Sequence, residues 1–492
     1  MAAAVAAVVA AAVCLRFATS SDLWLDEALS ANIARLPVGE LTDALRHDGH
    51  PPLYYLLLHW WMDVVGDGDA AVRSLSGVLS VATLPLAWFA GRRYAGRQGA
   101  VFMLLLMATS PFAVRYATEA RMYALVILLV TAGWLAVQRA LERPSVGRLA
   151  TVAVITGLLL LTHYWAFYLV AAALTALLWR ARRAPAPSAP RRVLGAVCLG
   201  GLLFVPWLPG FLDQLRNTGT PWGTPGRPAT VVMVSLTDFG GGAYAEAQVL
   251  GIVTAGLAVM ALVARPTGRL LVELDLRTLP PARPEAAVVA GTVTLAVVVS
   301  WLTASAFASR YMATVLPLVL LLAALGLTRF AHPGVRTGLV AVLVVLGAVG
   351  MARNVVYART QGGQVARVVN ALADRNDLVV FCPDQLGPAT GRYLRAGGSR
   401  LTYPEARPPE LVDWVDYQER VARGDPAEFA STLLDRAGPR SSIWLVWFGG
   451  YRTHDHACEE LANALGRVRP TAIAVEAGDA FEPMWLHRYP PG

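Results

Sequence analysis

Long apolar runs separated by short polar loops fill roughly the first 350 positions of the chain. A membrane-spanning helix needs about 20 mostly apolar residues, so each long run predicts one span. The first run is interpreted as an uncleaved span, because the candidate chemistry begins only a few residues after it. About eleven spans are expected, near residues 1–18, 71–90, 99–115, 122–139, 149–163, 165–180, 193–210, 246–264, 286–305, 311–328 and 337–352. The predicted fold is therefore an all-α polytopic transmembrane bundle.

One further apolar run, 51–66, is interpreted as a half-buried helix on the outer face of the membrane. It is short, begins with two prolines, and is rich in Tyr and Trp, which favour the membrane interface. Residues 19–70 then form one long extracytoplasmic loop with juxtamembrane helices. If 51–66 crossed the membrane instead, every later loop would change sides.

The composition changes near residue 353, where acidic residues and prolines become frequent and short β-type runs begin. Such runs alternating with helical stretches predict a small soluble α/β domain. We therefore divide the chain into a transmembrane module, 1–352, and an extracytoplasmic domain, 353–492. The sequence leaves open whether Cys382 and Cys458 form a disulfide in that domain or stay as free thiols. The predicted strands are 378–382, 443–448 and 472–475.

Composition and charge support a membrane protein, since 55% of the residues are hydrophobic and only 15% are charged. The net charge of +8 comes from short arginine clusters between apolar runs and not from an extended basic face, which argues against a nucleic-acid partner. The positive-inside rule places these clusters, and a Pro/Ala linker at 183–190, in the cytoplasm. We expect a multi-pass protein of the cell membrane, with its clusters at Arg92, Arg93 and Arg97; Arg139, Arg143 and Arg148; Arg180, Arg182, Arg183, Arg191 and Arg192; Arg265, Arg269 and Arg277; and Arg329 and Arg336.

The most specific polar feature is WLDEALSA, which places Asp26 and Glu27 together just after the first span. A carboxylate pair at the edge of the hydrocarbon is costly to desolvate unless it has a partner or a function. The alternative is ordinary interfacial charge that caps the following helix.

Two further motifs fall on the same outward side. In RHDGHPPLYY, two prolines fix the backbone after His50, although a helix start with a solvated histidine would give the same pattern. In SPFAVRYATEARMYAL, the cluster of Glu119, Arg121 and neighbouring tyrosines opposes the positive-inside trend and calls for an anionic partner such as phosphate. The structural alternative is that an arginine and the glutamate of this motif satisfy each other as an ion pair.

Weaker features are THYW, with His163 and Tyr164, and SRYMATVLP, with Arg310 and Tyr311. A lone histidine at such a turn is usually hydrogen-bonded within the bundle. An outward arginine beside apolar residues again calls for an anion.

Taken in order, the motifs WLDE, HPPLYY, RYATEARMY, HYW and SRY resemble those of the C-fold (GT-C) polytopic membrane glycosyltransferases. The resemblance covers roughly the first 330 residues and is closest to the protein O-mannosyltransferase-like and lipid A aminoarabinose transferase-like branches. Such enzymes pass a sugar, with inversion, from a polyprenyl phosphate to an acceptor on the outer side of the membrane. His50 stands where the aminoarabinose branch has lysine and the mannosyltransferase-like branch has histidine, which favours mannose.

The resemblance implies roles for individual residues. Asp26 would be the catalytic base with Glu27 beside it, and Glu119 the acidic residue of the second loop. Positive charge aimed at the leaving phosphate would come from His50, Arg121 and Arg310. Aromatic and histidine side chains of the same motifs would contact the substrates: Tyr54, Tyr55, Tyr116, His163, Tyr164 and Tyr311.

The expected partners are a polyprenyl-phosphate-linked sugar donor, a glycan, glycolipid or protein acceptor, and the lipid bilayer. A divalent cation that bridges Asp26, Glu119 and the phosphate would suit carboxylate ligands, and the sequence leaves this cofactor open. The main alternative function is a secondary transporter or flippase of a lipid-linked or anionic substrate. A transporter is expected to show internal repeats and polar groups near mid-span, and neither feature is seen in the sequence. A scaffold would leave the ordered polar motifs unexplained.

Overall fold

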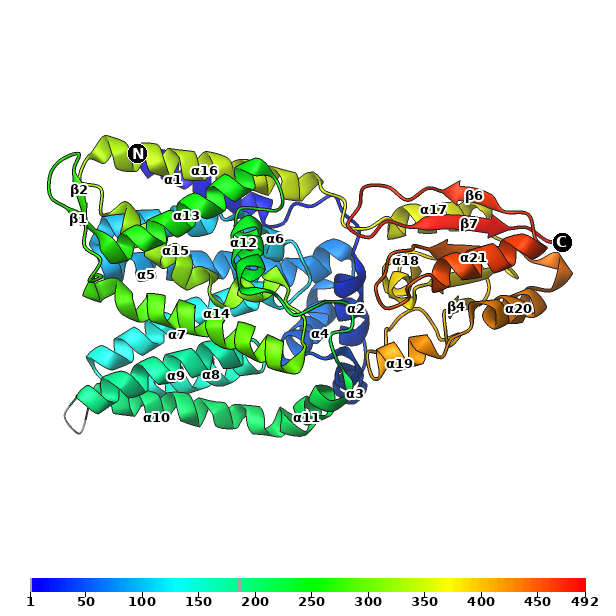
Figure 1. Ribbon diagram of the computed structural model, residues 1–492, viewed down its shortest axis with the longest axis horizontal. Helices are drawn as coiled ribbons and strands as arrows, with labels where there is room; N and C mark the ends of the chain where they lie inside the picture. Colours follow the sequence, from blue (N-terminus) through cyan, green and yellow to red (C-terminus); the bar gives the residue numbers. More distant parts are fainter. Residues whose placement is uncertain (1, 185–187) are drawn as a thin grey trace.

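The computed structural model describes residues 2–184 and 188–492, a bundle of helices with an α/β domain at one end (Figure 1). Met1 of the first predicted span and residues 185–187 of the predicted linker lie outside the described residues. The bundle contains α1 (Ala2–Leu15), α5 (Asp69–Ala108), α6 (Pro111–Ala117), α7 (Tyr123–Glu142), α8 (Val146–Leu160), α9 (Ala166–Arg183), α10 (Ala189–Gly201), η1 (Leu202–Trp207), α11 (Leu208–Asn217), α12 (Pro228–Phe239), α13 (Ala245–Val263), α14 (Arg283–Thr303), α15 (Leu316–Leu327) and α16 (Pro333–Val356).

Helix is present in all of the predicted spans. Among the described residues, six helical segments are long and apolar enough to cross a membrane by length and composition, and four apolar helices are shorter. The predicted number of about eleven crossings stays a prediction. One helix, α12, was not expected, because it lies in the predicted outer loop 211–245.

The long helix α5 is a hairpin of two helices, so it accounts for the two predicted spans 71–90 and 99–115. The chain leaves helical geometry at Ala95 and Gly96, where Gly96 has φ 59°. After this reversal the two halves touch at their glycines, since a Cβ on Gly91 would lie 2.2 Å from the carbonyl oxygen of Gly99. Arg92 and Arg93 thus lie just before the turn that joins the two halves.

Three shorter helices between α1 and α5 face the α/β domain: α2 (Leu25–Ala34), α3 (Val38–Asp48) and α4 (Leu53–Val65). The run 51–66 that was interpreted as interfacial forms α4, which packs against α2 and α5. Its 13 residues extend about 20 Å at 1.5 Å per residue, which is shorter than the roughly 30 Å hydrocarbon core.

The C-terminal domain contains a five-stranded sheet in the order β4-β3-β5-β7-β6. Its first three strands are parallel, and β7 is antiparallel to β5 and β6. Alternate residues of β3 face opposite layers: Val380 packs towards α20 and α21, whereas Phe381 packs towards α17 and α18. The bounds are β3 (Leu378–Cys382), β4 (Arg400–Thr402), β5 (Ile443–Trp447), β6 (Ala472–Val475), β7 (Trp485–Tyr489), α17 (Gly362–Leu372), α18 (Gly387–Gly391), α19 (Tyr417–Ala422), α20 (Pro426–Ala437) and α21 (Ala457–Val468).

Three predicted strands coincide with β3, β5 and β6, while β4 and β7 were not predicted. Cys382 and Cys458 form a disulfide. The helix that leads into the domain, α16, ends at Val356, four residues after the predicted boundary. Short elements complete the chain: a hairpin of β1 (Ala264–Pro266) and β2 (Val272–Leu274), and the 3₁₀ turns η2 (Pro280–Ala282), η3 (Ser309–Thr314), η4 (Asp384–Leu386) and η5 (Gly438–Arg440).

Candidate active site

The predicted polar motifs meet at the end of the bundle that faces the C-terminal domain. The first turn of α2 carries Asp26, the loop before α4 carries His50, the link from α6 to α7 carries Arg121, and η3 carries Arg310. These four positions are far apart in the chain. The structure therefore brings most of the predicted charged residues together in one cluster.

Asp26 lies at the centre of this cluster. Its side chain is 16% exposed, and its Oδ2 lies 3.4 Å from Nη1 of Arg310 and 3.8 Å from Nη2 of Arg121. Oδ2 has no hydrogen-bond partner among the described residues. A carboxylate oxygen that faces two guanidinium groups without being fully bonded is able to accept a proton or to exchange partners.

Arg121 is held by a relay that begins at Asp48. The His50 Nδ1 pairs with Oδ2 of Asp48 at 2.8 Å, and Nη2 of Arg121 lies 2.9 Å from the His50 Nε2. Because arginine can only donate, Nε2 is the acceptor and the proton of the neutral ring lies on Nδ1. Tyr55 joins the relay by donating to Asp48 at 2.7 Å and accepting from Nη1 of Arg121 at 3.2 Å. His50 thus orients Arg121 in this arrangement.

Asp48 is the anionic end of this relay and is almost fully buried. Burial alone would raise the pKa of its carboxyl. The neighbouring His50 and Arg121 and the hydrogen bond from Tyr55 outweigh that effect and hold the pKa below its ordinary value. Asp48 therefore stays ionised and fixes the tautomer of His50.

Glu27, next to Asp26, makes contacts of a different kind. It is fully buried and forms a two-pronged ion pair with Arg73, at 2.7 Å to Nε and 2.5 Å to Nη2. It also accepts the backbone N–H of Ala120 at 2.9 Å, which ties α2 to the segment before α7. The predicted catalytic role of Glu27 stays a prediction. Its contacts show a residue that fixes the position of Asp26.

Glu119 is also buried, 1% exposed on its side chain, and pairs with Nε of Arg115 at 3.2 Å. The structural alternative weighed for this motif is thus present. Arg359, from the segment after α16, approaches both acids, at 3.7 Å from Glu27 and 3.8 Å from Glu119. Its guanidinium also donates to the backbone oxygen of Thr118 at 2.8 Å. Glu119 therefore belongs to a buried charge layer behind Asp26.

The predicted aromatic residues divide into two groups. Tyr311 and His163 are close to the cluster, with ring centroids 5.2 Å apart and with Tyr311 adjacent to Arg310. Tyr55 is part of the relay. Tyr54 is instead buried in the core, where its hydroxyl pairs with Ser76 at 2.9 Å, and Tyr116 packs between Phe112 and Tyr123.

Tyr164 lies away from Asp26 and supports the loop that carries His50. Its hydroxyl bonds with Gln214 of α11 and accepts from Trp207 at 2.9 Å. Gln214 in turn donates to the backbone oxygens of Leu45, at 2.6 Å, and His50, at 3.2 Å. The contacts assign Tyr164 a supporting position, and direct contact between its side chain and a substrate stays a prediction.

Sequence reasoning missed three residues of this region: Arg73, Arg359 and Glu482. Arg73 is an arginine at the outward end of a span, so the positive-inside argument used for Arg121 could have found it. Glu482 carries no such signal. It lies between β6 and β7 of the C-terminal domain, and its Oε1 accepts the backbone N–H of Leu25 at 2.9 Å. An acid from the far end of the sequence therefore satisfies a free amide at the start of the helix that carries Asp26.

Burial raises the pKa of Glu482 to about 8, helped by the nearby Asp26 and Glu27, although hydrogen bonds from Leu25 and Thr360 act against it. The folded protein thus binds a proton here that the unfolded chain releases near pH 4.5. The contribution of Glu482 to the free energy of unfolding is complete below the pKa that the group has in the unfolded chain. It falls as pH rises towards the pKa in the folded protein, by about 1.4 kcal/mol per pH unit for one linked proton.

We therefore expect thermal unfolding in detergent to occur at lower temperature as pH rises from 5 to 8, and Glu482→Gln to flatten this dependence. The exposed Glu476→Gln is the matched control and should keep the wild-type slope. An unchanged slope in Glu482→Gln would show that Glu482 does not titrate in this range.

The predicted metal site does not fit the geometry. In the part of the chain that the structure describes, no group of three His, Cys, Asp or Glu side chains is placed to hold a metal ion. Oδ2 of Asp26 faces Arg121 and Arg310, and Oε1 of Glu119 faces Arg115, so guanidinium groups stand where further ligands would be needed.

A bundle of apolar helices with a cluster of charged side chains at the end that faces an α/β domain is the architecture expected from the GT-C resemblance. The comparisons confirm that resemblance: the chain has the GT-C glycosyltransferase fold, and its similarities lie in the mannosyltransferase-like and ArnT-like branch. The family model for dolichyl-phosphate-mannose-protein mannosyltransferase matches residues 49–209, about a third of the chain. No curated protein sequence matches the chain.

Solved structures share the fold at low sequence identity. ArnT from Cupriavidus metallidurans bound to undecaprenyl phosphate has a TM-score of 0.63 and 12% identity, over 99% of this chain and 97% of ArnT. ArnT in the apo state has a TM-score of 0.65 and 14% sequence identity, over 99% of this chain and 98% of ArnT. The oligosaccharyltransferase of Archaeoglobus fulgidus in the apo form has a TM-score of 0.50 and 9% sequence identity, over 90% of this chain and 69% of that protein.

Proposed function

We propose that this protein is an inverting glycosyltransferase that moves a sugar from a polyprenyl-phosphate donor to an acceptor hydroxyl on the extracytoplasmic face of the membrane. The observation that carries the proposal is the Asp26 carboxylate, which faces Arg121 and Arg310 with an oxygen that has no hydrogen bond among the described residues. The similarity to a mannosyltransferase family model and to an ArnT structure with bound undecaprenyl phosphate supports the donor class. Mannose is the favoured sugar, because His50 matches the mannosyltransferase-like motif.

The donor phosphate is proposed to enter between the two arginines. In the free protein, Arg121 and Arg310 both approach Oδ2 of Asp26. A bound phosphate would take over these contacts, because a guanidinium bonds two phosphate oxygens at once. Donor binding would then release Oδ2 of Asp26 towards the acceptor.

The transfer is a single displacement at the anomeric carbon. The acceptor oxygen forms the new bond while its proton passes to the Asp26 carboxylate. The bond between the anomeric carbon and the phosphate oxygen breaks, and its electron pair stays on the lipid phosphate. Arg121 and Arg310 stabilise the charge that develops there, so no acid catalyst is required. Attack from the face opposite the phosphate inverts the anomeric configuration.

Asp26→Asn tests this assignment, because it keeps the shape of the side chain and removes the base. In membranes supplied with polyprenyl-phosphate mannose and an acceptor extract, we expect transfer to fall by about 10²-fold or more. Asp43→Asn, an exposed acid of the neighbouring helix α3, is the control and should transfer at the wild-type rate. Equal transfer by Asp26→Asn and wild type would exclude Asp26 as the base.

A further inference from the structure

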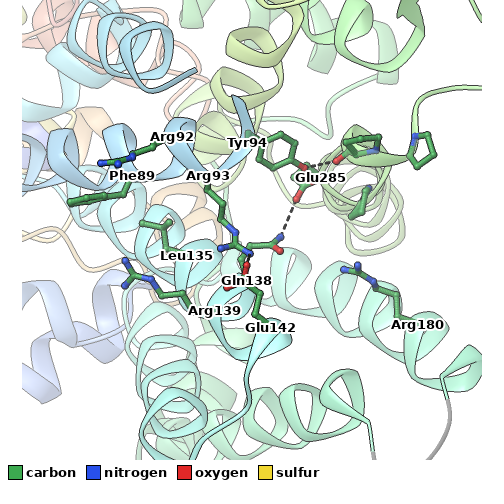
Figure 2. A pocket seen from close by; sticks show the side chains of 13 residues that line it. Phe89, Arg92, Arg93, Tyr94, Leu135, Gln138, Arg139, Glu142, Arg180 and Glu285 are labelled. Carbon is green, nitrogen blue, oxygen red and sulfur yellow. Dashed lines mark hydrogen bonds and ion pairs between the residues drawn. The ribbon is translucent and has the colours of Figure 1, made fainter. Parts of the chain in front are cut away.

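A polar cavity is lined by elements at the end of the bundle that is opposite to the C-terminal domain (Figure 1). It has a volume of about 650 Å³ and lies between the turn of α5, the end of α7, the end of α9 and the start of α14. Figure 2 shows the side chains that line it, including Arg92, Arg139, Arg180 and Glu285. None of these residues belongs to the Asp26 cluster.

The charges of the cavity favour an anionic ligand. Four arginines and two glutamates line it, which leaves a net positive lining. Arg93 is paired with Glu142 at 2.5 Å. The side chains of Arg92, Arg139 and Arg180 have no ion pair or hydrogen bond with any described residue, so their donors are free to bind a phosphate.

Glu285 adds a requirement for a hydrogen-bond donor on that ligand. It is 3% exposed, and its Oε1 accepts from Trp134 at 3.0 Å and from Gln138 at 3.2 Å. By hydrogen-bond geometry its Oε2 is buried without a partner among the described residues, although the Tyr94 hydroxyl, which donates to the backbone oxygen of Pro281, lies beside this carboxylate. A buried carboxylate oxygen is costly to leave unpaired, and a ligand hydroxyl would satisfy it.

An apolar groove continues from this cavity into the bundle. The two share Gln138, Arg180, Pro284 and Glu285 as lining residues. The groove is otherwise mostly apolar and follows α7 from Leu141 back to Leu129, which is about 18 Å along the helix. A hydrocarbon chain would fit there, with its polar head among the arginines.

We propose that this cavity and groove form a second binding site for a lipid-linked sugar phosphate, the same class of molecule as the proposed donor. The arginines would bind the phosphate, Glu285 and Gln138 would bind sugar hydroxyls, and the groove would hold the prenyl chain. The positive lining disfavours a head that carries an amine, and the size of the cavity suits a head larger than phosphate alone. Because the arginine clusters are predicted to be cytoplasmic, the site would take up donor from that leaflet. The inference rests on the proposed function for the identity of the ligand.

The test counts binding sites instead of turnover. Asp26→Asn protein in nanodiscs is titrated with radiolabelled short-chain polyprenyl-phosphate mannose, so that no donor is consumed. We expect about two sites per chain, and about one after adding Arg139→Ala and Arg180→Ala, whose exposed and unpaired side chains make a folding defect unexpected. Arg143→Ala, on the same face but outside the cavity, is the control and should keep two binding sites per chain. Glu285→Gln should weaken the second site about 10-fold.

Competitors identify the ligand of this site. Polyprenyl phosphate without sugar and phosphatidylglycerol should each displace the second labelled molecule at least 10-fold less well than the sugar phosphate. Equal displacement by phosphatidylglycerol would overturn the proposal in favour of a general anionic-lipid site. A single site that the Arg139 and Arg180 substitutions do not affect would also overturn it, while the proposed transferase activity would stand. Absence of any donor binding would contradict both.

Discussion

Replacing Arg121 with lysine is expected to slow sugar transfer by about 10²- to 10³-fold while the protein stays folded. The planar guanidinium of Arg121 donates to His50, Tyr55 and Ser30 and still reaches Asp26. A lysine ammonium keeps the charge but has no fork with which to make these contacts in one plane. The loss should therefore appear in the chemical step more than in donor affinity.

The measurement is the initial rate of transfer with polyprenyl-phosphate mannose, separated into kcat and KM, alongside the unfolding temperature in detergent. Arg46→Lys is the matched control, since Arg46 lies on α3 of the same outer segment and is 46% exposed. A rate of Arg121→Lys within a few-fold of wild type would show that charge alone is sufficient at this position. A lowered unfolding temperature would assign the loss to folding instead.

Replacing Glu27 with glutamine is expected to destabilise the protein by about 3–5 kcal/mol, which is typical of removing one partner of a buried ion pair. Glu27 is fully buried and is the close carboxylate partner of Arg73, which would be left as an unpaired buried charge. Arg359, 3.7 Å from Glu27, would lose part of its compensation as well.

Unfolding in detergent, followed by tryptophan fluorescence or by protease resistance, measures this loss. The double variant Glu27→Gln, Arg73→Met should recover part of the stability, because it removes the uncompensated cation. Exposed Glu40→Gln provides the control. If Glu27→Gln unfolds at the wild-type temperature and loses transfer, Glu27 acts in the chemistry itself, as the motif resemblance implies.

The helices of the bundle could be predicted from the sequence, because a long apolar run is compatible with few structures other than a membrane-spanning helix. A short apolar run is compatible with a helix, a strand or a loop. Helix α12 escaped prediction because its apolar stretch is brief and lies within a polar loop. Strand β7, with the sequence WLHRY, mixes histidine and arginine with apolar residues and pairs between β5 and β6 only after the domain folds. The reversal inside α5 was anticipated as a loop between two spans, since arginines and glycines interrupt the apolar pattern there.

The charged residues of the site could be predicted where they opposed a general trend. Arg121 and Arg310 stood out as arginines on the outward side, and Asp26 as an acid at a hydrocarbon edge. Two supporting residues could not be recognised: Arg359, which approaches Glu27 and Glu119, and Glu482, which bonds to Leu25, lie in segments where charged residues are ordinary. Only tertiary contact reveals them: the burial of Glu482 and its bond to Leu25 come from residues 457 positions apart.

The contact between Glu482 and Leu25 has a consequence for the biosynthesis of this protein. The helices of the bundle enter the membrane before the C-terminal domain has been made, and at that stage the start of α2 lacks the Glu482 carboxyl and the buried acids lack Arg359. The nascent bundle therefore has an incomplete charge layer behind Asp26 at that stage. Under the proposed function, competence for sugar transfer would arise only when the C-terminal domain docks on the bundle, so that an incompletely translated copy would lack it.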